Sequence, residues 1–324
     1  MNILITGGAG YIGSHICYRL IDKGHKVSTI DNLSMGSKKL IPKEAHHLNC
    51  DISNFKVILP FLKKNKFNVV MHLAAFTSVA DSLKNPKKYL ENNFDKAKVF
   101  IDLCLENNLD KFIFSSTAAV YGNLNSFNNV SEKTKANPNN PYAESKFKLE
   151  QFFLKEVAKK NADCTILRYF NVAGADLKKR TGFISKSDNL IKLICEVATK
   201  KRSKLIINGN DYQTKDGTPI RDFIHVSDIA DIHIAVAESL TISGESEIYN
   251  CGYGEGFSVM DVISAINSII KFKLPIEIGP RRKSDIVYSV ANNKKFLKKF
   301  NWKPKYNDLK VILESALEWE KHNQ

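Results

Sequence analysis

The sequence predicts an α/β protein with a Rossmann-type, doubly wound parallel sheet and a smaller carboxy-terminal α/β domain. A glycine-rich turn joins the first predicted strand to the first predicted helix, which is how a βαβ unit begins. Further short apolar runs follow, separated by segments of helical periodicity, and this alternation favours a parallel sheet. The 324 residues, 43% of them hydrophobic and 25% charged, are enough for a large core divided between two domains.

The first predicted strand, Asn2–Thr6, opens directly into the glycine-rich turn. The glycines of the fingerprint are Gly7, Gly10 and Gly13. This spacing permits a tight turn and close approach to a pyrophosphate, while free amides at the helix start attract its charge. A second strand, Val27–Ile30, ends in Asp31. A carboxylate there accepts both ribose hydroxyls and repels a 2′-phosphate, so NAD is favoured over NADP. The alternative is an ordinary tight turn with Asp31 as a surface acid.

The next strands extend the candidate site. Asp51 and Ile52 follow a short apolar stretch where a helix is expected to begin, so Asp51 either reaches an adenine or caps that helix. Val69–Ala75 has the pattern of a buried strand that ends in small residues. Lys111–Phe114 predicts another strand, followed by a hydroxyl triplet that ends in Thr117. Ligands bind beyond the carboxyl ends of parallel strands, so Thr117 is a candidate for a sugar contact, with backbone capping as the alternative.

A phenol and an ammonium, Tyr142 and Lys146, lie four residues apart at the start of a predicted amphipathic helix. The two side chains therefore share one helical face. A free tyrosine has a pKa of about 10, so a basic role at neutral pH requires nearby positive charge, part of which Lys146 can supply. The expected buried stripe of this helix is Leu149, Phe152, Phe153 and Val157. Such a pair in isolation usually lies on a solvated face, and the preceding nucleotide motif reverses that interpretation.

Composition excludes several classes. The six cysteines are dispersed without a Cys-x-x-Cys motif and are expected in a reduced core, and the eight histidines show no metal-ligand spacing. Because of this spacing we expect no metal. The net charge of +14 is spread over separate lysine pairs, so we also expect no nucleic-acid partner. No apolar run is long enough for a membrane span, and the first strand leaves no room for a signal peptide. We therefore expect a cytoplasmic protein without a membrane partner.

Together these motifs resemble an extended short-chain dehydrogenase/reductase of the UDP-glucose/UDP-galactose 4-epimerase family, with its UDP-N-acetylglucosamine branch as one candidate. The resemblance continues through Leu167–Asn171, Gly209–Tyr212, Asp216–Thr218, Arg221–Val226, Tyr249–Gly252 and Pro280–Arg282. It thus runs essentially from end to end. It implies an NAD-dependent isomerase that reversibly inverts C4 of UDP-glucose and UDP-galactose, and also of the N-acetylated UDP-hexosamines, through a transient 4-keto sugar and enzyme-bound NADH.

The resemblance also assigns roles by position. The catalytic residues it implies are Tyr142, Lys146 and Thr117. The NAD contacts it implies are Gly7, Gly10, Tyr11, Ile12, Gly13, Asp31, Asn32, Asp51, Ile52, Asn92, Tyr142, Lys146 and Phe170. The substrate contacts it implies are Thr117, Asn171, Asn189, Leu190, Arg221, Arg282 and Ser289. A diphosphate needs charge-assisted donors, which supports the two arginines independently. Surface ion pairs are their alternative role.

Three positions depart from the family pattern. Thr77 stands where a lysine often approaches the cofactor, and Asn208 stands where an aromatic residue often faces the uracil. Ser289 stands where a tyrosine limits the sugar pocket of some bacterial relatives. A small residue there leaves room for an acetamido group, although a serine at a strand end need not set the size of a pocket.

We expect an NAD-binding domain over residues 1–173 and a UDP-sugar-binding domain over residues 174–324, with a segment from about 220 to 250 that packs back on the first. The resemblance implies a homodimer. A nucleotide-sugar 4,6-dehydratase is one alternative, but such enzymes typically have Asp-Glu after the threonine, where this chain has Ala118-Ala119. A related dehydrogenase or decarboxylase is another. An NAD-sensing regulator is the non-enzymatic alternative, and such relatives tend to lose the tyrosine and lysine retained here.

Overall fold

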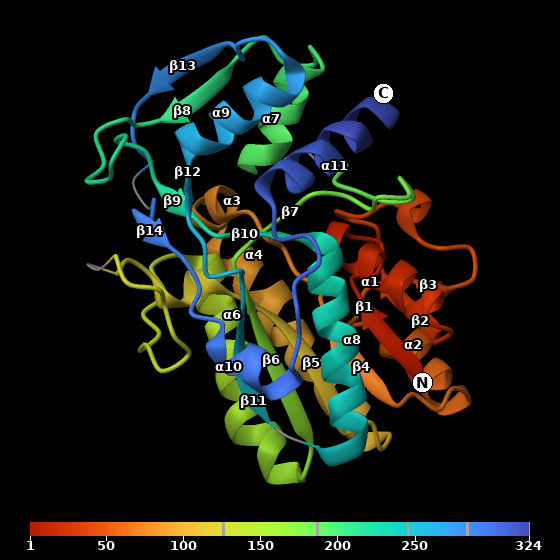
Figure 1. The fold of residues 1–324 in the computed structure, drawn as a ribbon. Coiled ribbons are helices and arrows are strands. Elements are labelled where there is room, and N and C mark those ends of the chain that lie inside the picture. The colour runs from red at the N-terminus through yellow and green to blue at the C-terminus, as the bar shows by residue number, and fades with distance from the viewer. Residues whose placement is uncertain (125–126, 186–187, 245, 283–284, 324) are drawn as a thin grey trace. The chain divides into compact units, whose positions relative to one another are not determined.

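The computed structural model describes residues 1–124, 127–185, 188–244, 246–282 and 285–323 (Figure 1). Contacts divide the chain into two compact units. Unit 1 comprises Met1–Val120, Pro138–Arg168 and Ala230–Tyr249. Unit 2 comprises Tyr121–Asn137, Tyr169–Ile229 and Asn250–Gln324. Each unit is thus assembled from separate segments, and the expected division into domains at residue 173 stays a prediction.

A seven-stranded sheet in the order β11-β6-β5-β4-β1-β2-β3 forms the centre of unit 1. Its strands are β1 (Asn2–Thr6), β2 (Lys26–Asp31), β3 (His46–Asn49), β4 (Val69–His72), β5 (Lys111–Thr117), β6 (Asp163–Tyr169) and β11 (Glu247–Cys251). Strand β1 pairs in parallel with both β2 and β4. The strand order therefore reverses beside β1, which is the switch point where doubly wound folds bind nucleotides. The expected fold class is confirmed.

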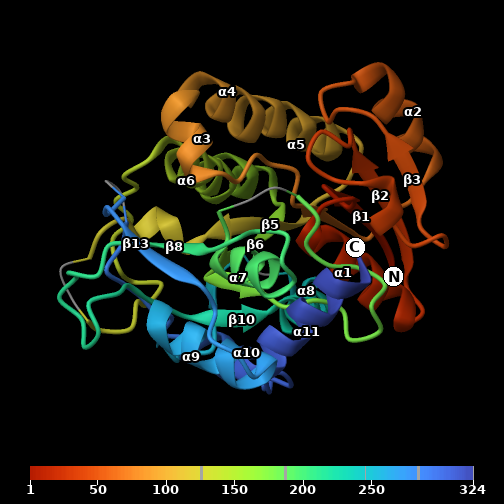
Figure 2. The ribbon, with the colours of Figure 1, turned by 90° about the horizontal axis from the view of Figure 1, so that it is seen from above.

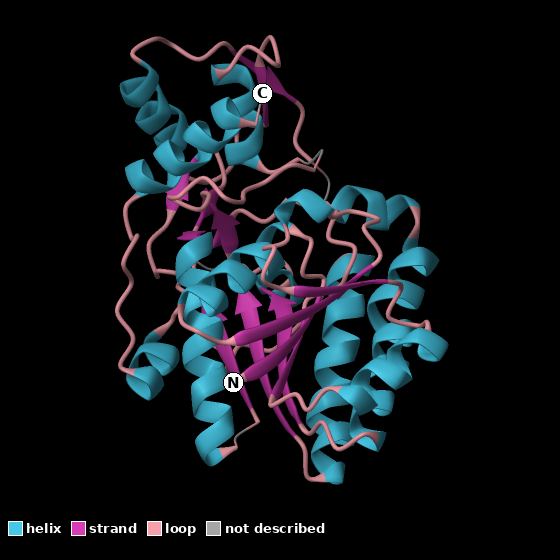
Figure 3. Cartoon of the chain, turned by 90° about the vertical axis from the view of Figure 1, so that its right-hand side faces the viewer, coloured by secondary structure: helices cyan, strands magenta, loops and turns pink. Residues whose placement is uncertain are grey.

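Helices cover both faces of this sheet (Figure 3). They include α1 (Tyr11–Asp22), α2 (Phe55–Lys64), α3 (Val79–Lys84), α4 (Pro86–Leu90), α5 (Lys96–Glu106), α6 (Pro141–Phe152) and α8 (Val226–Ser243). Figure 2 shows α4 and α5 following one another, with α6 beside them. Shorter turns are η1 (Lys38–Leu40), η2 (Glu91–Asp95), η3 (Ala118–Tyr121), η4 (Phe153–Val157) and η5 (Ala158–Lys160). Of these, η2 and η4 are π-helical, and η2 joins α4 to α5 in one continuous helical run.

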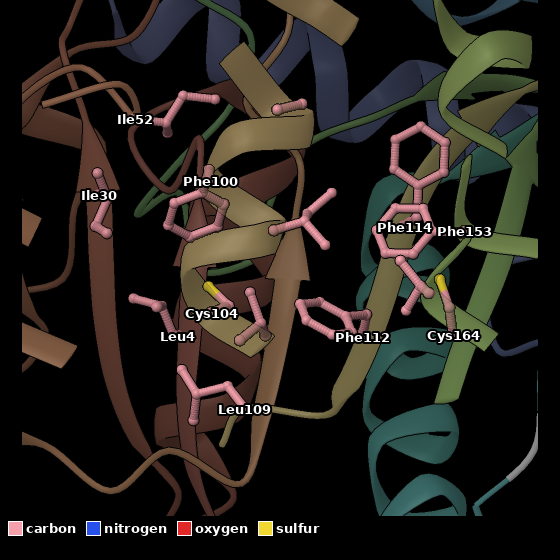
Figure 4. Close-up of a cluster of buried hydrophobic side chains, with 14 of the residues drawn as sticks. Leu4, Ile30, Ile52, Phe100, Cys104, Leu109, Phe112, Phe114, Phe153 and Cys164 are labelled. Carbon is pink, nitrogen blue, oxygen red and sulfur yellow. The ribbon is translucent and has the colours of Figure 1, made fainter. Parts of the chain in front are cut away.

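Apolar side chains from α2, α5 and α6 meet one face of the sheet in a single core (Figure 4). Leu4 and Phe112 contribute from the strands, and Phe100 and Cys104 contribute from α5. The expected stripe of the helix that carries Tyr142 is buried as predicted, in α6 and η4. This packing fixes the orientation of α6 against the ends of the strands.

The described residues of unit 2 form four helices and three small sheets. The helices are α7 (Leu190–Ala198), α9 (Val259–Ile270), α10 (Lys294–Phe300) and α11 (Leu309–His322). The strand pairs are β8 (Leu205–Asn208) with β13 (Ile276–Gly279), and β7 (Asn171–Ala173) with β10 (Phe223–His225). In the third sheet, β9 (Ile220–Arg221) lies between β12 (Phe257–Ser258) and β14 (Tyr288–Ser289). Apolar residues of α7, α9 and α11 form the core of this unit.

All six cysteines are buried with free thiols, as expected for core residues. Within the described ranges, no helix combines the length and the apolar character that a membrane crossing needs. Over the same residues, no group of three or more His, Cys, Asp or Glu side chains is arranged to hold a metal ion.

Candidate active site

The glycine-rich turn at the end of β1 leaves no room for side chains. Gly7 has a φ of +78°, and a Cβ atom there would lie 2.7 Å from the backbone nitrogen of Ala74. A Cβ atom on Gly13 would lie 2.2 Å from the carbonyl oxygen of Gly7. Gly10 is the N-cap residue of α1, which begins at Tyr11. The backbone is therefore open to close approach by a phosphate at the start of a helix.

Asp31 holds this turn in place. One carboxylate oxygen accepts a hydrogen bond from the backbone nitrogen of Ala9 at 3.0 Å, and the other accepts from that of Leu33 at 2.8 Å. A carboxylate has about four acceptor sites, so both oxygens can still accept from ribose hydroxyls. The position at the carboxyl end of β2, beside the glycine turn, fits the predicted role in binding NAD.

Asp51 does not cap a helix, because α2 begins later, at Phe55, with Asn54 in the N-cap position. Its carboxylate instead accepts from the amide of Asn32 at 3.0 Å and from Lys96 at 3.2 Å. It also accepts from the backbone nitrogen and the hydroxyl of Ser53. Burial raises the pKa of Asp51, but these hydrogen bonds outweigh burial and hold the pKa below its usual value.

Asn32 and Ile52, the two predicted NAD contacts beside Asp51, differ in the groups that they can present to a cofactor. The side chain of Asn32 is exposed and hydrogen-bonded to the carboxylate of Asp51. Ile52 is buried with its side chain in the core cluster, so only its backbone is available to a cofactor.

Asn92 lies on the π-helical turn η2, a feature that is frequent at functional sites. Its amide donates to Asn93, whose own amide donates to the hydroxyl of Ser145 at 3.1 Å and to the carbonyl of Phe76 at 3.0 Å. Ser145 stands in α6 between Tyr142 and Lys146. Asn93 therefore ties the loop after β4 to the catalytic helix, a role that the sequence analysis missed.

The predicted catalytic residues meet at the carboxyl end of β5. Asn140 caps α6 by accepting from the backbone nitrogen of Ala143 at 2.9 Å, which places Tyr142 in the first turn. Tyr142 is half-buried and shares a hydrogen bond with Thr117. Thr117 also accepts from the backbone of Ala119, so the contact role and the capping role occur together.

Lys146 is almost completely buried, with 3% of its surface exposed. Its Nζ donates to the carbonyl oxygen of Ser115 at 2.7 Å and stands 5.0 Å from the centre of the Phe114 ring. Burial lowers the pKa of Lys146 to about 7, and the charge of Glu150 opposes that shift.

The environment of Tyr142 affects the pKa on which its predicted basic role depends. Burial raises the pKa of Tyr142, and the hydrogen bond with Thr117 lowers it by less, so the pKa lies above the ordinary value. Burial leaves Lys146 with a pKa near neutrality, so the lysine is a weaker source of charge than the sequence argument assumed. The chain alone therefore does not supply all the positive charge that a phenolate needs.

In unit 2, Arg221 lies on β9 and pairs with Asp285 at 2.6 Å. The hydroxyl of Tyr212 donates to the second oxygen of the same carboxylate at 3.3 Å. Arg282 is exposed, and the amide oxygen of Asn208 accepts from its Nε and Nη2 at 3.2 Å in the orientation that matches donors to acceptors. The unexpected asparagine thus has a partner among the predicted substrate residues.

Ser289 lies on β14 directly beside Arg221 on β9. The residue after Arg221 is Asp222, whose backbone nitrogen donates to the Ser289 carbonyl and whose carbonyl accepts from the backbone nitrogen of Asn171. Three predicted substrate residues are therefore brought together by adjacent strands of unit 2.

The remaining predicted residues of unit 2 have backbone or helix-end roles. Asn189 caps α7 by accepting from the backbone nitrogen of Lys192 at 3.2 Å, and Leu190 is the first residue of that helix. Phe170 is buried, and its backbone nitrogen donates to the carbonyl oxygen of Cys251 at 3.0 Å.

The sequence analysis missed two acids beside the arginines, Asp285 and Asp222. Asp222 is fully buried, and its carboxylate accepts from the backbone nitrogens of Tyr253, Gly254 and Ala291. Burial raises the pKa of Asp222 to about 6 although these three hydrogen bonds lower it. The available signal was proximity, since Asp222 follows Arg221 and Asp285 follows Arg282 by three residues.

Comparison with known proteins gives consistent results. Residues 3–252 match the model of the NAD dependent epimerase/dehydratase family. A UDP-glucose 4-epimerase of Azospirillum brasilense is 39% identical over 98% of this chain and 92% of its own. A UDP-glucose 4-epimerase structure from Stenotrophomonas maltophila, with bound NAD and formylated UDP-arabinopyranose, has a TM-score of 0.95 and 31% identity, with coverage of 100% and 98%. The UDP-Glc/GlcNAc 4-epimerase of Campylobacter jejuni has a TM-score of 0.85 and 41% identity, with coverage of 99% for each chain.

Proposed function

Because the chain belongs to the NAD dependent epimerase/dehydratase family, we propose that it interconverts the C4 epimers of UDP-hexoses. The substrates are UDP-glucose and UDP-galactose, together with UDP-GlcNAc and UDP-GalNAc. The observation that carries this proposal is the cluster of Thr117, Tyr142 and Lys146 at the end of β5, in the same unit as the glycine turn. Relatives named UDP-glucose 4-epimerase match over the full length of the chain.

The residues of unit 1 fit NAD. The glycine turn and the start of α1 would hold the pyrophosphate, and Asp31 would hold the adenosine ribose. Asp51 and the neighbouring Asn32 would border the adenine, while Asn92 and Lys146 would contact the nicotinamide half. The backbone of Ile52 and the residues Tyr11 and Ile12 complete the proposed contacts of this unit, and Phe170, which belongs to unit 2, is the remaining predicted contact.

The proposed chemistry begins at the C4 hydroxyl of the sugar. Tyr142 takes the hydroxyl proton, and Thr117, which already shares a hydrogen bond with it, moves that proton. NAD held in this site would supply the positive nicotinamide ring that favours the phenolate and the reversible hydride acceptor that C4 epimerisation needs. Lys146, fixed on the Ser115 carbonyl, stays within the same site throughout.

Unit 2 supplies the proposed nucleotide contacts. Arg221 and Arg282 would bind the diphosphate, since guanidinium groups form bidentate, charge-assisted hydrogen bonds with phosphate oxygens. Arg221 is already paired with Asp285, so a phosphate would bind an arginine that is held in position. Asn171, Asn189 and Leu190 would contact the sugar and base, and Ser289 would leave room for an acetamido group.

The alternatives are less well supported. After Thr117 the chain turns through Ala118 and Ala119, where a 4,6-dehydratase would need acidic side chains. A non-catalytic regulator would have no need of the Tyr142, Lys146 and Thr117 arrangement. A net dehydrogenase or decarboxylase would release NADH, which an epimerase retains and reoxidises.

The decisive experiment offers the purified protein each of the four UDP-sugars without an added oxidant. Chromatography should show the C4 epimer of each sugar at equilibrium and no net NADH. Release of a 4-keto-6-deoxy sugar or stoichiometric NADH would point to a dehydratase or a dehydrogenase. Absence of any product from all four sugars would contradict the epimerase proposal.

Homodimer formation and a cytoplasmic location are also proposals, and both follow from the family resemblance. Light scattering on the purified protein distinguishes a dimer from a monomer directly. Fractionation of cells that produce the untagged chain tests the location.

A further inference from the structure

A buried carboxylate lies one helical turn beyond Lys146 and has no role in the proposed chemistry. Glu150 is fully buried in α6, and its Oε1 accepts from the hydroxyl of Ser116 at 2.5 Å and from Nε of Arg168 at 2.9 Å. Its Oε2 accepts from Nη2 of Arg168 at 2.6 Å. One carboxylate therefore joins the catalytic helix to both β5 and β6.

The partners of Glu150 stand among the catalytic contacts. Ser116 lies between Ser115, whose carbonyl receives Lys146, and Thr117, which bonds to Tyr142. Glu150 itself is four residues after Lys146, on the same face of α6. A shift of α6 along β5 would change both catalytic contacts, and the Glu150–Ser116 hydrogen bond resists that shift.

Stability alone does not explain a pair buried in this way. Arg168 has 3% of its surface exposed and Glu150 has none, so both groups lose their hydration. Replacing a buried ion pair by apolar residues of similar volume is often neutral or stabilising. An alignment role accounts for the charged pair, because a bidentate guanidinium–carboxylate contact fixes direction as well as distance.

We propose that Glu150, held by Arg168, is a positioning residue that sets the register of α6 against the end of β5 and so aligns Lys146 and Tyr142 for C4 chemistry. The inference rests on the proposed epimerase function. Glu150 is assigned no contact with substrate or cofactor, and it acts through Ser116 and through the charge that it places near Lys146.

The charge of Glu150 gives the proposal a second readout. His72 on β4 and Glu150 on α6 interact with Lys146, and Tyr142 lies one turn before it on the same helix. Arg168 and Cys164 on β6 interact with Glu150. His72 stays neutral near pH 7, because burial and the charge of Lys146 lower the pKa of His72 to about 3. Burial raises the pKa of Cys164 well above its usual value, so this thiol is neutral as well. Loss of the Glu150 charge would therefore lower the pKa of Lys146 further, because that charge opposes the effect of burial.

The test compares Glu150→Gln with Glu144→Gln, a matched control on the same helix. Glu144 is exposed and pairs with Lys148 at 3.3 Å. We expect Glu150→Gln to lower kcat roughly 10- to 100-fold, the scale of a small misalignment, with little change in KM. The alkaline limb of the kcat profile should move to lower pH. The Glu144→Gln variant should match the wild type in both measurements.

Two further variants keep the test decisive if Glu150→Gln folds poorly. The double variant Glu150→Leu/Arg168→Met removes both charges and should fold, and it should show the same loss of kcat. Ser116→Ala removes only the hydrogen bond to β5 and should give a smaller loss of kcat. A folded double variant with wild-type kcat and pH profile would overturn the proposal, as would a loss that follows only the folded fraction.

A measurement without substrate separates this proposal from the proposed function. NMR titration of the Lys146 side chain in the chain alone should give a lower pKa in Glu150→Gln than in the wild type. If the wild type epimerises none of the four sugars, the epimerase proposal fails while the titration still reports on Glu150. If the wild type is active and neither kcat nor the Lys146 titration changes in Glu150→Gln, the positioning role fails by itself.

Discussion

The Lys146 ammonium nitrogen lies 2.7 Å from the carbonyl oxygen of Ser115, the first of the three hydroxyl residues that end β5. The contact holds a charged group almost entirely out of solvent. It connects the stability of the folded chain to the protonation state of a residue proposed to act in catalysis.

The free energy of unfolding should depend on pH through this lysine. The pKa of Lys146 falls from 10.5 in a free side chain to about 7 in the fold because of burial. Between these values the unfolded chain binds a proton that the folded chain has lost, so stability rises with pH, by at most about 1.4 kcal/mol per pH unit. Below the folded pKa this contribution is constant.

Urea denaturation of the wild type and of Lys146→Met, without NAD, measures this contribution. The difference in unfolding free energy, wild type minus variant, should increase from about pH 7 to about pH 10. A difference that stays flat over this range would show that Lys146 keeps an ordinary pKa.

Tyr142→Phe should reduce turnover at least about 100-fold, because the proton acceptor is lost. The ring stays in the first turn of α6, so NAD binding should persist. Single-turnover kinetics measure the chemical step, and a fluorescence titration measures NAD affinity. Turnover near the wild-type rate would exclude the basic role, and loss of NAD binding would point to a structural effect.

Asp31→Ala should weaken NAD binding and narrow the preference over NADP, because the ribose acceptor and the repulsion of a 2′-phosphate disappear together. The substitution also removes the acceptor for the backbone of Ala9. Asp31→Asn is the useful companion, since its amide oxygen can keep that bond while the charge is lost. Titration of each variant with both cofactors decides the role, and an unchanged ratio of affinities would reject it.

Ser289→Tyr should remove activity on UDP-GlcNAc selectively, by roughly 5- to 150-fold in kcat/KM, because overpacking costs about 1 to 3 kcal/mol. UDP-glucose should be affected much less. The substitution Tyr288→Phe at the adjacent position is a control, since it removes the hydrogen bond to Asn129. It should change kcat/KM for neither sugar. An equal loss of kcat/KM on both sugars, or no loss on either, would show that residues other than Ser289 set the size of the pocket.

The features that could be predicted from sequence are those encoded by neighbouring residues. The strand, glycine turn and helix around Gly7 are consecutive segments of the sequence. A spacing of four residues likewise places Tyr142 and Lys146 on one face of their helix. The acid at the end of β2 was predictable because it directly follows the short predicted strand Val27–Ile30, the second strand after the glycine turn.

Features formed by distant residues could not be predicted in this way. Glu150 and Arg168 form a buried pair across α6 and β6, and nothing in the spacing of an acid and a base distinguishes burial from a solvated surface. The start of α2 was misplaced because Asp51 and Asn54 are both good helix caps. Only the structure shows that Asn54 takes the N-cap position, while Asp51 accepts from Asn32 and Lys96. The raised pKa of Tyr142 is likewise a property of packing, which periodicity does not report.

Because unit 1 is assembled from three chain segments, it cannot be completed until late in the synthesis of the chain. The unit 1 segment Ala230–Tyr249, which holds most of α8 and of β11, is translated only after Tyr169–Ile229, which belongs to unit 2. Until it emerges from the ribosome, Arg19 lacks the carboxylate of Asp231 and β6 remains an open sheet edge. A nascent chain or a truncated product that ends at Arg168 therefore exposes the edge of β6, which promotes self-association. We expect that a fragment ending there does not form a stable, monomeric unit 1.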